Sequence, residues 1–268
     1  MRRFERVARA AIARAGALIR ARFGGRHAVA FKSATDIVTV TDREAELLIV
    51  GALRAAFPDH GIVSEESPPV PARSDYRWYV DPLDGTTNFA HGYPHCAVCI
   101  ALEHAGEIVL GLVHDPLRRE TFSAQRGAGA QLNGRAIGVS DVTELGNALA
   151  ATGFPSDRRE RARDYARFLE VALERARCVR RSGSAALDLC YVACGRLDVY
   201  WEWGLAPWDT AAGRLIVEEA GGRITGFAGE SHSLTGFETA ASNGHLHDAL
   251  VEMLAAGSLR RTLATDDE

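Results

Sequence analysis

The sequence predicts a mixed protein of helices and strands, α+β in its first half and α/β in its second. The first half opens with two amphipathic helical segments and continues with closely spaced apolar segments rich in strand formers. The second half alternates strand-like with helical segments, an order typical of α/β proteins. The 268 residues fit one domain. We expect it to span 1–260, with halves at 1–144 and 145–260, and a frayed tail at 261–268.

The composition argues against several classes of protein. The formal net charge is -4, so we expect no nucleic acid as a partner. No run of about 18 apolar residues could cross a membrane, and the arginine-rich start lacks the continuous apolar core of a signal peptide. Five cysteines, an odd number, argue against a disulfide framework. We therefore expect a cytoplasmic protein with no membrane contact and with reduced thiols.

In the first half, helices are predicted from apolar residues at helical spacing, and strands from short apolar runs between turn signals. Thr41-Asp-Arg-Glu44 has the pattern of a capping box, which places Asp42 in the first turn of the second helix. Ala105-Gly106 predicts a hairpin, and Asn133-Gly134 predicts a further turn. The expected order is a helix from Phe4 to about Gly24, a strand at 37–40, a helix to Phe57, strands at 62–63 and 76–80, paired strands at 96–103 and 107–114, and a strand at 119–124.

In the second half, Ser184 is suited to cap one helix and Pro207 to the first turn of another, while Gly221 and Gly222 would end the latter. The expected order is a strand at 148–152, a charged helix at 157–177, an extended segment at 178–180, a helix at 185–193, a strand at 197–201, a helix from Pro207 to about Ala220, strands at 223–225 and 238–241, and a helix at 245–256.

The stretch from Trp78 to Phe89 concentrates the chemistry of the chain. Its strand should stop at Pro82, which has no N–H for a ladder hydrogen bond. Asp81 and Asp84 would then lie at the C-terminal end of a strand, where open α/β sheets place their ligands. Gly85 and the two threonines after it can open a helix whose free N–H groups attract a phosphate. An ordinary Asp-rich turn is the alternative interpretation.

Acidic oxygens beside an anion site imply a cation between them. Carboxylates without His or Cys suggest a hard ion such as Mg²⁺. A second acidic strand end, at Glu65 and Glu66, lies within about twenty residues of the first. Cys96 and Cys99 have C-x-x-C spacing but no second pair, so we interpret them as core thiols.

Three blocks together resemble the inositol monophosphatase family, within the wider group of Mg²⁺-dependent, lithium-sensitive phosphatases. They are Glu65 within 64–67, Asp81-Pro-Leu-Asp-Gly-Thr-Thr-Asn-Phe89 and Pro207-Trp-Asp-Thr-Ala-Ala-Gly213, in the order of the family. The later Val217-Glu-Glu-Ala-Gly-Gly222 fits as well. The resemblance implies a layered αβαβα sandwich of the inositol monophosphatase and fructose-1,6-bisphosphatase type.

The resemblance also implies which residues form the site. Glu65, Asp81 and the Leu83 carbonyl would hold one Mg²⁺, and Asp81, Asp84 and Asp209 a second, with two or three ions in total. Asp42 and Thr86, together with Glu65, would orient and deprotonate the attacking water. The implied substrate-binding residues are Asp84, Gly85, Thr86, Gly183, Ser184, Ala185, Glu202 and Asp209.

The resemblance implies hydrolysis of a small-molecule phosphomonoester, with myo-inositol 1-phosphate as the expected substrate. Thr87 favours it, because relatives that act on histidinol phosphate or on 3′-phosphoadenosine nucleotides commonly carry Lys there. Fructose 1,6-bisphosphate stays open, since some family members accept both sugars. A regulatory binding role beside catalysis also stays open, although no metal carboxylate is missing. A homodimer is the family expectation.

Overall fold

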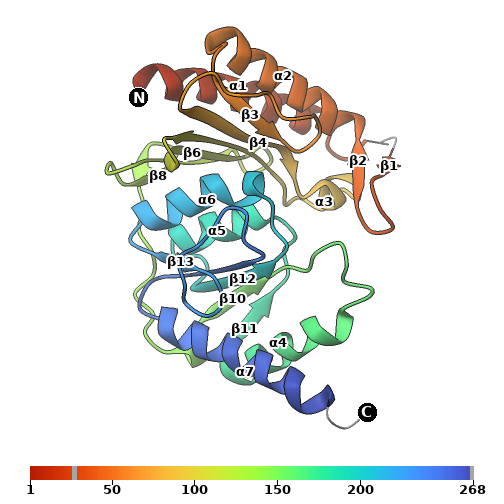
Figure 1. Cartoon of the computed structure of the whole chain (residues 1–268), viewed down its shortest axis with the longest axis vertical. Coiled ribbons are helices and arrows are strands. Elements are labelled where there is room, and N and C mark those ends of the chain that lie inside the picture. Colours follow the sequence, from red (N-terminus) through yellow and green to blue (C-terminus); the bar gives the residue numbers. More distant parts are fainter. Residues whose placement is uncertain (26–28, 266–268) are drawn as a thin grey trace.

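The computed structural model describes the chain at residues 1–25 and 29–265, and side chains up to residue 258. Its elements stack as five layers, helix on sheet on helix on sheet on helix (Figure 1). The αβαβα arrangement that the resemblance implied is therefore confirmed. Among the described residues, no helix combines the length and the apolar character needed to cross a bilayer.

The first outer layer contains helices α1 (Arg2–Arg22) and α2 (Val40–Ala56), which pack on a seven-stranded sheet. Apart from the parallel pair β3–β4, neighbouring strands of that sheet are antiparallel, as expected for an α+β half. In spatial order its strands are β3 (Gly61–Ser64), β4 (Tyr76–Asp84), β5 (Ala97–His104), β6 (Glu107–Asp115), β7 (Glu120–Gln125), β8 (Ala130–Leu132) and β9 (Arg135–Ala136).

The second sheet has five strands and combines parallel with antiparallel pairs. In spatial order they are β11 (Cys178–Arg180), β10 (Leu149–Thr152), β12 (Val199–Trp203), β14 (Glu238–Ser242) and β13 (Arg223–Thr225). A separate hairpin joins β1 (Val29–Phe31) to β2 (Ile37–Thr39). The remaining short helices are α3 (Thr86–Ala90) and a 3₁₀ turn at Leu145–Asn147.

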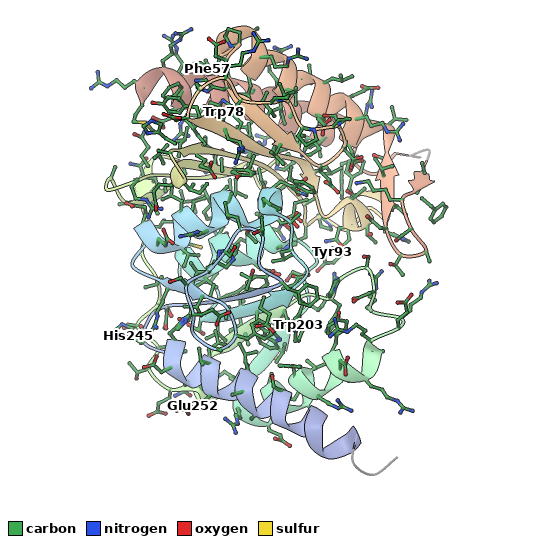
Figure 2. The ribbon with its side chains drawn as sticks, in the orientation of Figure 1. Phe57, Trp78, Tyr93, Trp203, His245 and Glu252 are labelled. Carbon is green, nitrogen blue, oxygen red and sulfur yellow. The ribbon has the colours of Figure 1, made fainter. Side chains whose placement is uncertain are left out.

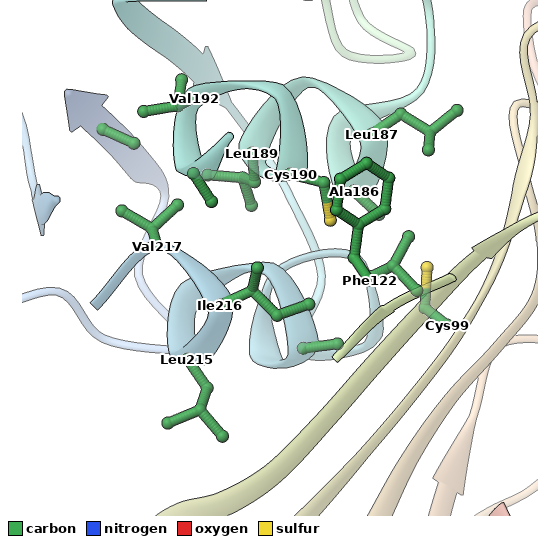
Figure 3. Packing of buried hydrophobic residues seen from close by; sticks show 14 of the residues in the cluster. Cys99, Phe122, Ala186, Leu187, Leu189, Cys190, Val192, Leu215, Ile216 and Val217 are labelled. Atoms are coloured by element: carbon green, nitrogen blue, oxygen red, sulfur yellow. The ribbon is translucent and has the colours of Figure 1, made fainter. Parts of the chain in front are cut away.

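Helices α5 (Ala185–Ala193) and α6 (Pro207–Glu219) lie between the sheets, and α4 (Ala162–Arg175) and α7 (His247–Thr265) cover the outer face of the second sheet (Figure 1). Apolar side chains fill the space between each pair of layers. Figure 2 shows Trp78 in the upper layers and Trp203 in the lower ones. In Figure 3, Phe122 of the first sheet lies beside Ala186 and Leu187 of α5.

Four sequence expectations about element ends are wrong. Strand β4 continues past Pro82 to Asp84, because a register shift against β5 between Asp81 and Asp84 accommodates a residue without an N–H. The cap of α2 is Thr39, with Asp42 rather than Glu44 as its partner. Helix α4 begins at Ala162, after hydrogen-bonded turns at 155–161. Helix α7 begins at His247 and continues to Thr265, beyond Ala256.

The five cysteines are free thiols, as the odd count predicted. Cys96 and Cys99 are buried against opposite faces of the first sheet, in two different core clusters. Their C-x-x-C spacing therefore follows from strand geometry, which alternates side chains between the faces.

Candidate active site

A pocket of about 470 Å³ opens where the two halves of the chain meet. It lies at the C-terminal end of β4 and at the N-termini of α3 and α6, where open α/β sheets place their ligands. The predicted site residues that line it are Glu65, Asp81, Leu83, Asp84, Gly85, Thr86, Gly183 and Asp209.

The irregular end of β4 decides how its residues face the pocket. The Leu83 N–H donates to Asp81 Oδ1 at 2.9 Å, which fixes a tight turn around Pro82. Because the register shifts between Asp81 and Asp84, both carboxylates and Leu83 line the pocket. Regular alternation alone would place Asp81 and Asp84 on opposite faces of a strand.

Gly85 makes the turn from β4 into α3 possible. Its φ of 87° lies in the left-handed region, which favours glycine. A Cβ at this position would stand 3.0 Å from the His95 carbonyl oxygen and 3.1 Å from that of Gly183. Any side chain would therefore move the start of α3, whose first N–H groups have no partner within the helix.

Asp84 is held by the start of α5. The Ser184 hydroxyl donates to Asp84 Oδ2 at 2.6 Å, and the Ala186 N–H donates to the same oxygen at 2.9 Å. Ser184 is buried and also caps α5 by accepting from the Leu187 N–H. Ser184 and Ala185 are not among the pocket-lining residues, unlike Gly183 before them. In this structure, Ser184 orients Asp84 from behind the pocket wall.

Asp209 reaches the pocket from the first turn of α6. Its Oδ2 accepts from the Ala206 N–H at 2.7 Å, which closes the turn that Pro207 begins. This contact fixes one carboxylate oxygen of Asp209 at the helix start.

Glu65 follows β3 and has two neighbours that the sequence analysis missed. The ammonium group of Lys32, next to strand β1, lies 2.7 Å from Glu65 Oε1 and also pairs with Glu66. The buried Glu46 of α2 accepts from the Ser64 hydroxyl and, at 2.8 Å, from the Glu66 N–H. Glu46 thus fixes the turn that carries Glu65. An acidic residue on the apolar face of a helix was the available sequence signal.

Burial is the main cause that raises the pKa values of the four pocket carboxylates, Glu65, Asp81, Asp84 and Asp209. Burial, followed by the charges of Glu65, Asp84 and Asp209, raises the pKa of Asp81 well above its ordinary value. Burial and the Asp84 charge likewise raise the pKa of Asp209, and burial raises the pKa values of Asp84 and Glu65. Glu65 and Asp81 are close enough for their side chains to hydrogen-bond. Such a cluster is stable in its ionised form when cations lie among the oxygens.

The donor set fits Mg²⁺ in its chemistry, because it consists of carboxylates and a backbone carbonyl. Within the described ranges, no group of three or more His, Cys, Asp or Glu side chains is arranged to hold a metal ion as it stands. The Lys32 ammonium group pairs with one oxygen of Glu65. In this structure a lysine provides positive charge beside a carboxylate that the sequence analysis assigned to Mg²⁺.

Asp42 and Thr86 lie together, although 44 residues separate them. The Thr86 hydroxyl is 2.7 Å from Asp42 Oδ1 and 3.0 Å from the Leu83 carbonyl oxygen. Asp42 is fully buried, and its Oδ2 accepts from the N–H and hydroxyl of Thr39. Burial raises the pKa of Asp42, while these hydrogen bonds oppose the shift. A threonine that donates to Asp42 has its lone pairs free to accept from a water in the pocket.

Glu202 is not among the residues that line the pocket. Its Oε2 accepts from the Tyr200 hydroxyl at 2.6 Å, and its carboxylate covers Gly153, where a Cβ would stand 1.9 Å from Oε2. Burial raises the pKa of Glu202 to about 7. Since Phe154 lines the pocket, Glu202 packs against the residue next to the pocket wall.

The pocket also contains basic and aromatic residues that the sequence analysis did not assign. Arg158 donates to the Thr35 and Pro155 carbonyls, and Arg181 lies with its guanidinium carbon 5.9 Å from the Phe154 ring centroid. In the described part of the chain, neither guanidinium forms an ion pair with a carboxylate. The charged helix expected at 157–177 included Arg158, and this is wrong for Arg158 because it precedes α4 and lines the pocket.

The chain is similar to proteins of known family over most of its length. A family model described as the inositol monophosphatase family matches residues 1–258. The Nus factor SuhB of Pseudomonas aeruginosa is 45% identical over 225 residues, which are 82% of this chain and 83% of that protein. The crystal structure of extragenic suppressor protein suhB from Bartonella henselae is 39% identical, with a TM-score of 0.90 over 94% of this chain and 98% of that one. An inositol monophosphatase from Anabaena is 40% identical, with a TM-score of 0.86 over 95% and 96%.

Proposed function

The chain belongs to the inositol monophosphatase family, and we propose that it hydrolyses a phosphomonoester with the help of Mg²⁺. Myo-inositol 1-phosphate, cleaved to inositol and phosphate, is the substrate that we propose first. The observation that carries the proposal is the convergence of four carboxylates from three separate segments on one pocket, beside the first turn of α3. A surface turn rich in Asp would not gather residues as distant as Glu65 and Asp209.

In this proposal Glu65, Asp81 and the Leu83 carbonyl hold one Mg²⁺, and Asp81, Asp84 and Asp209 hold a second. Bound Mg²⁺ supplies positive charge to the phosphate and makes water a stronger nucleophile. Lys32 can keep Glu65 ionised until the site is loaded, because its ammonium group already pairs with that carboxylate.

The residues of the chain itself supply the proton acceptor and the orientation. Thr86 donates its hydroxyl proton to Asp42 and accepts a hydrogen bond from the attacking water, so that the pair, with Glu65, draws the proton away from the water. The N–H groups of Gly85 and Thr86 would bind the phosphate oxygens at the start of α3. Most of the rate then comes from positioning and charge neutralisation, as expected for phosphoryl transfer.

Selection of the leaving group is assigned to the wall of the pocket. Gly183 lines the pocket, Ser184 and Ala185 start α5 directly after it, and Glu202 packs against Gly153, the residue before Phe154. We propose that Glu202 accepts hydrogen bonds from substrate hydroxyls, which requires its carboxylate to turn from the Tyr200 hydroxyl towards the pocket.

The direct test is an initial-rate panel of phosphomonoesters with and without Mg²⁺. It should contain myo-inositol 1-phosphate, fructose 1,6-bisphosphate, histidinol phosphate, a 3′-phosphoadenosine nucleotide and an aryl phosphate. Solvent ¹⁸O should appear in the phosphate released in a single turnover, since water is the nucleophile. No Mg²⁺-dependent hydrolysis of any member would refute the proposed activity, and ¹⁸O absent from the phosphate would show that water does not attack the phosphorus atom and that the bond on the carbon side of the ester oxygen is cleaved.

Arg158 and Arg181 favour fructose 1,6-bisphosphate as a second candidate substrate. Both line the pocket, and guanidinium groups match phosphate oxygens in charge and geometry. A substrate whose leaving group carries a second phosphate would pair with them, whereas inositol offers no anion there. Arg158→Gln and Arg181→Gln should then raise KM for the bisphosphate by about tenfold or more, the size of one charged hydrogen bond. Arg159→Gln, an exposed neighbour, is the control, and equal effects on inositol phosphate would exclude this role.

The name of the Pseudomonas relative supports a binding role beside catalysis, because it is called a Nus factor. We propose that this chain can share that role. The Asp84→Asn variant, without hydrolytic activity, should then still replace the relative in cells that lack it. Failure of the inactive variant together with success of the wild type would instead tie that role to hydrolysis.

A further inference from the structure

The phosphate-binding segment, residues 84–88, is bracketed by two stretches of chain that are distant in sequence. On one side, the His95 carbonyl oxygen lies 2.8 Å from the Asn88 side-chain nitrogen. On the other, the Ser182 and Gly183 carbonyl oxygens lie 2.9 and 3.2 Å from the same nitrogen. The backbone at Gly85 is equally enclosed by the His95 and Gly183 carbonyls. The position of this segment therefore depends on how the two sides are held to each other.

Two buried side chains, one from each of these two stretches, face each other. His95 Nε2 lies 4.0 Å from Oδ1 of Asp188, which stands on the first turn of α5. His95 is 4% exposed and Asp188 is 1% exposed. In the part of the chain that the structure describes, neither of these two atoms has a hydrogen-bond partner. Buried polar atoms without partners are rare in folded proteins, because each costs the free energy of its lost hydration.

The surroundings favour a hydrogen bond between His95 Nε2 and Asp188 Oδ1. The His95 ring meets the Tyr191 ring edge-on, with centroids 5.8 Å apart, which restricts its rotation. Burial lowers the pKa of His95 to about 4, so the imidazole is neutral and can carry its one N–H on Nε2. Burial raises the pKa of Asp188 well above its ordinary value, and the neighbouring Ser182 side chain opposes this shift. Closing the distance by about 1 Å gives an ordinary N–H···O hydrogen bond.

We propose that His95 Nε2–H donates to Asp188 Oδ1, and that this buried pair positions the phosphate-binding segment and Asp84 for hydrolysis. The inference rests on the proposed phosphatase activity for its functional consequence. It follows because the turn of α5 that carries Asp188 also holds Asp84, through the Ser184 hydroxyl and the Ala186 N–H. His95 and Asp188 touch no reacting atom and are positioning residues.

Variants of His95 distinguish a positioning role of its hydrogen bond from a packing role of its ring. His95→Phe keeps a ring of similar size without the donor, and His95→Gln places an amide N–H near the position of Nε2. We expect His95→Phe to lower kcat by about 10–100-fold and to raise the Mg²⁺ concentration needed for half-maximal activity by the same factor. This is the usual range for residues that orient metal ligands. His95→Gln should restore both to within about threefold. Asp188→Asn, which keeps an acceptor oxygen, should behave like His95→Gln, and Asp188→Leu like His95→Phe.

His232 supplies the matched control. It is buried, its Nδ1 likewise has no partner among the described residues, and its Nε2 pairs with Thr239, away from the pocket lining. His232→Phe should lower the thermal midpoint without changing kcat or half-activation by Mg²⁺. If His95→Phe and His232→Phe lose stability equally, and kcat and Mg²⁺ activation are unchanged in both, the positioning role of His95 is overturned.

A nuclear magnetic resonance measurement tests the pair without any activity. In the wild type, without Mg²⁺ or substrate, the His95 imidazole should show a slowly exchanging proton on Nε2, identified by its absence in His95→Gln. The same signal should weaken or vanish in Asp188→Leu and persist in Asp188→Asn. An unprotonated Nε2 would overturn the pair even if the enzyme is active. A wild type that shows the signal but hydrolyses no phosphomonoester would instead refute the proposed function.

Discussion

Replacing Gly111 by Ala should destabilise the protein at the contact between the first sheet and α6. Gly111 is buried in β6, in register with Ala101 and Ala124 on the neighbouring strands. A Cβ at Gly111 would stand 2.8 Å from the Ala212 carbonyl oxygen, 3.1 Å from its Cα and 3.3 Å from its carbonyl carbon. These are backbone atoms of a helix, so no side chain can rotate away, and α6 itself must move.

The magnitude follows from two opposing terms. Overpacking of a tight core costs about 1–3 kcal/mol. Replacing a glycine in the interior of a strand stabilises the protein by about 0.5–1 kcal/mol, because the unfolded chain then has less conformational entropy to lose. The net loss should be about 1–2 kcal/mol, which lowers the thermal midpoint of a chain of this size by a few degrees. Because Asp209 lies three residues before Ala212 on α6, the same displacement should lower kcat by about tenfold or more.

Gly51 provides the control with the same chemical change and the opposite expected sign. It is exposed on α2, and no atom lies within 4 Å of a Cβ placed there. Gly51→Ala should therefore raise stability by about 0.5–1 kcal/mol through helix propensity alone. Thermal unfolding of both variants, together with steady-state kinetics, gives the comparison. A Gly111→Ala protein as stable as the wild type, with unchanged kcat, would refute the argument that α6 is placed by this close approach.

Four further outcomes are expected. Asp84→Asn should abolish turnover in millimolar Mg²⁺ with little change in thermal midpoint, because it removes one metal-facing charge at similar volume. Near-normal rates in this variant would contradict the metal assignment. Turnover by the wild type should be inhibited by Li⁺. Thr86→Ala and Asp42→Asn should each lower kcat by about 10²–10⁴-fold, with the double variant little worse; additive losses would separate their roles. Glu202→Gln should impair hydrolysis of inositol phosphate more than that of an aryl phosphate, and equal losses would place Glu202 in the catalytic apparatus. Burial lowers the pKa of His247 from 6.5 to about 4, so the folded state favours its neutral form. Its contribution to stability should be complete above about pH 6.5 and decline as pH falls toward 4, and a His247→Gln protein whose unfolding free energy has the same pH dependence would exclude this.

Local patterns in the sequence determined the order of the elements and the candidate metal ligands. The helices of the first layer follow from apolar spacing, and the hairpin at Ala105-Gly106 from turn chemistry, because both depend on residues a few positions apart. The carboxylates of Asp81, Asp84 and Asp209 were identifiable because each stands in a short, distinctive motif at the end of a strand or the start of a helix.

Contacts across long stretches of chain were decided by the tertiary structure. The pairing of Lys32 with Glu65, and the hydrogen bond from Ser184 to Asp84, join residues 33 and 100 positions apart, and no local period encodes such contacts. The sequence predicted a capping box from Thr41 to Glu44 at the start of α2. Thr39 became the cap because Asp42 is buried and its carboxylate needs the two Thr39 donors. Glu202 accepts from the Tyr200 hydroxyl for a similar reason, because a carboxylate withdrawn from water needs a donor, and only the packed structure determines which donor is near.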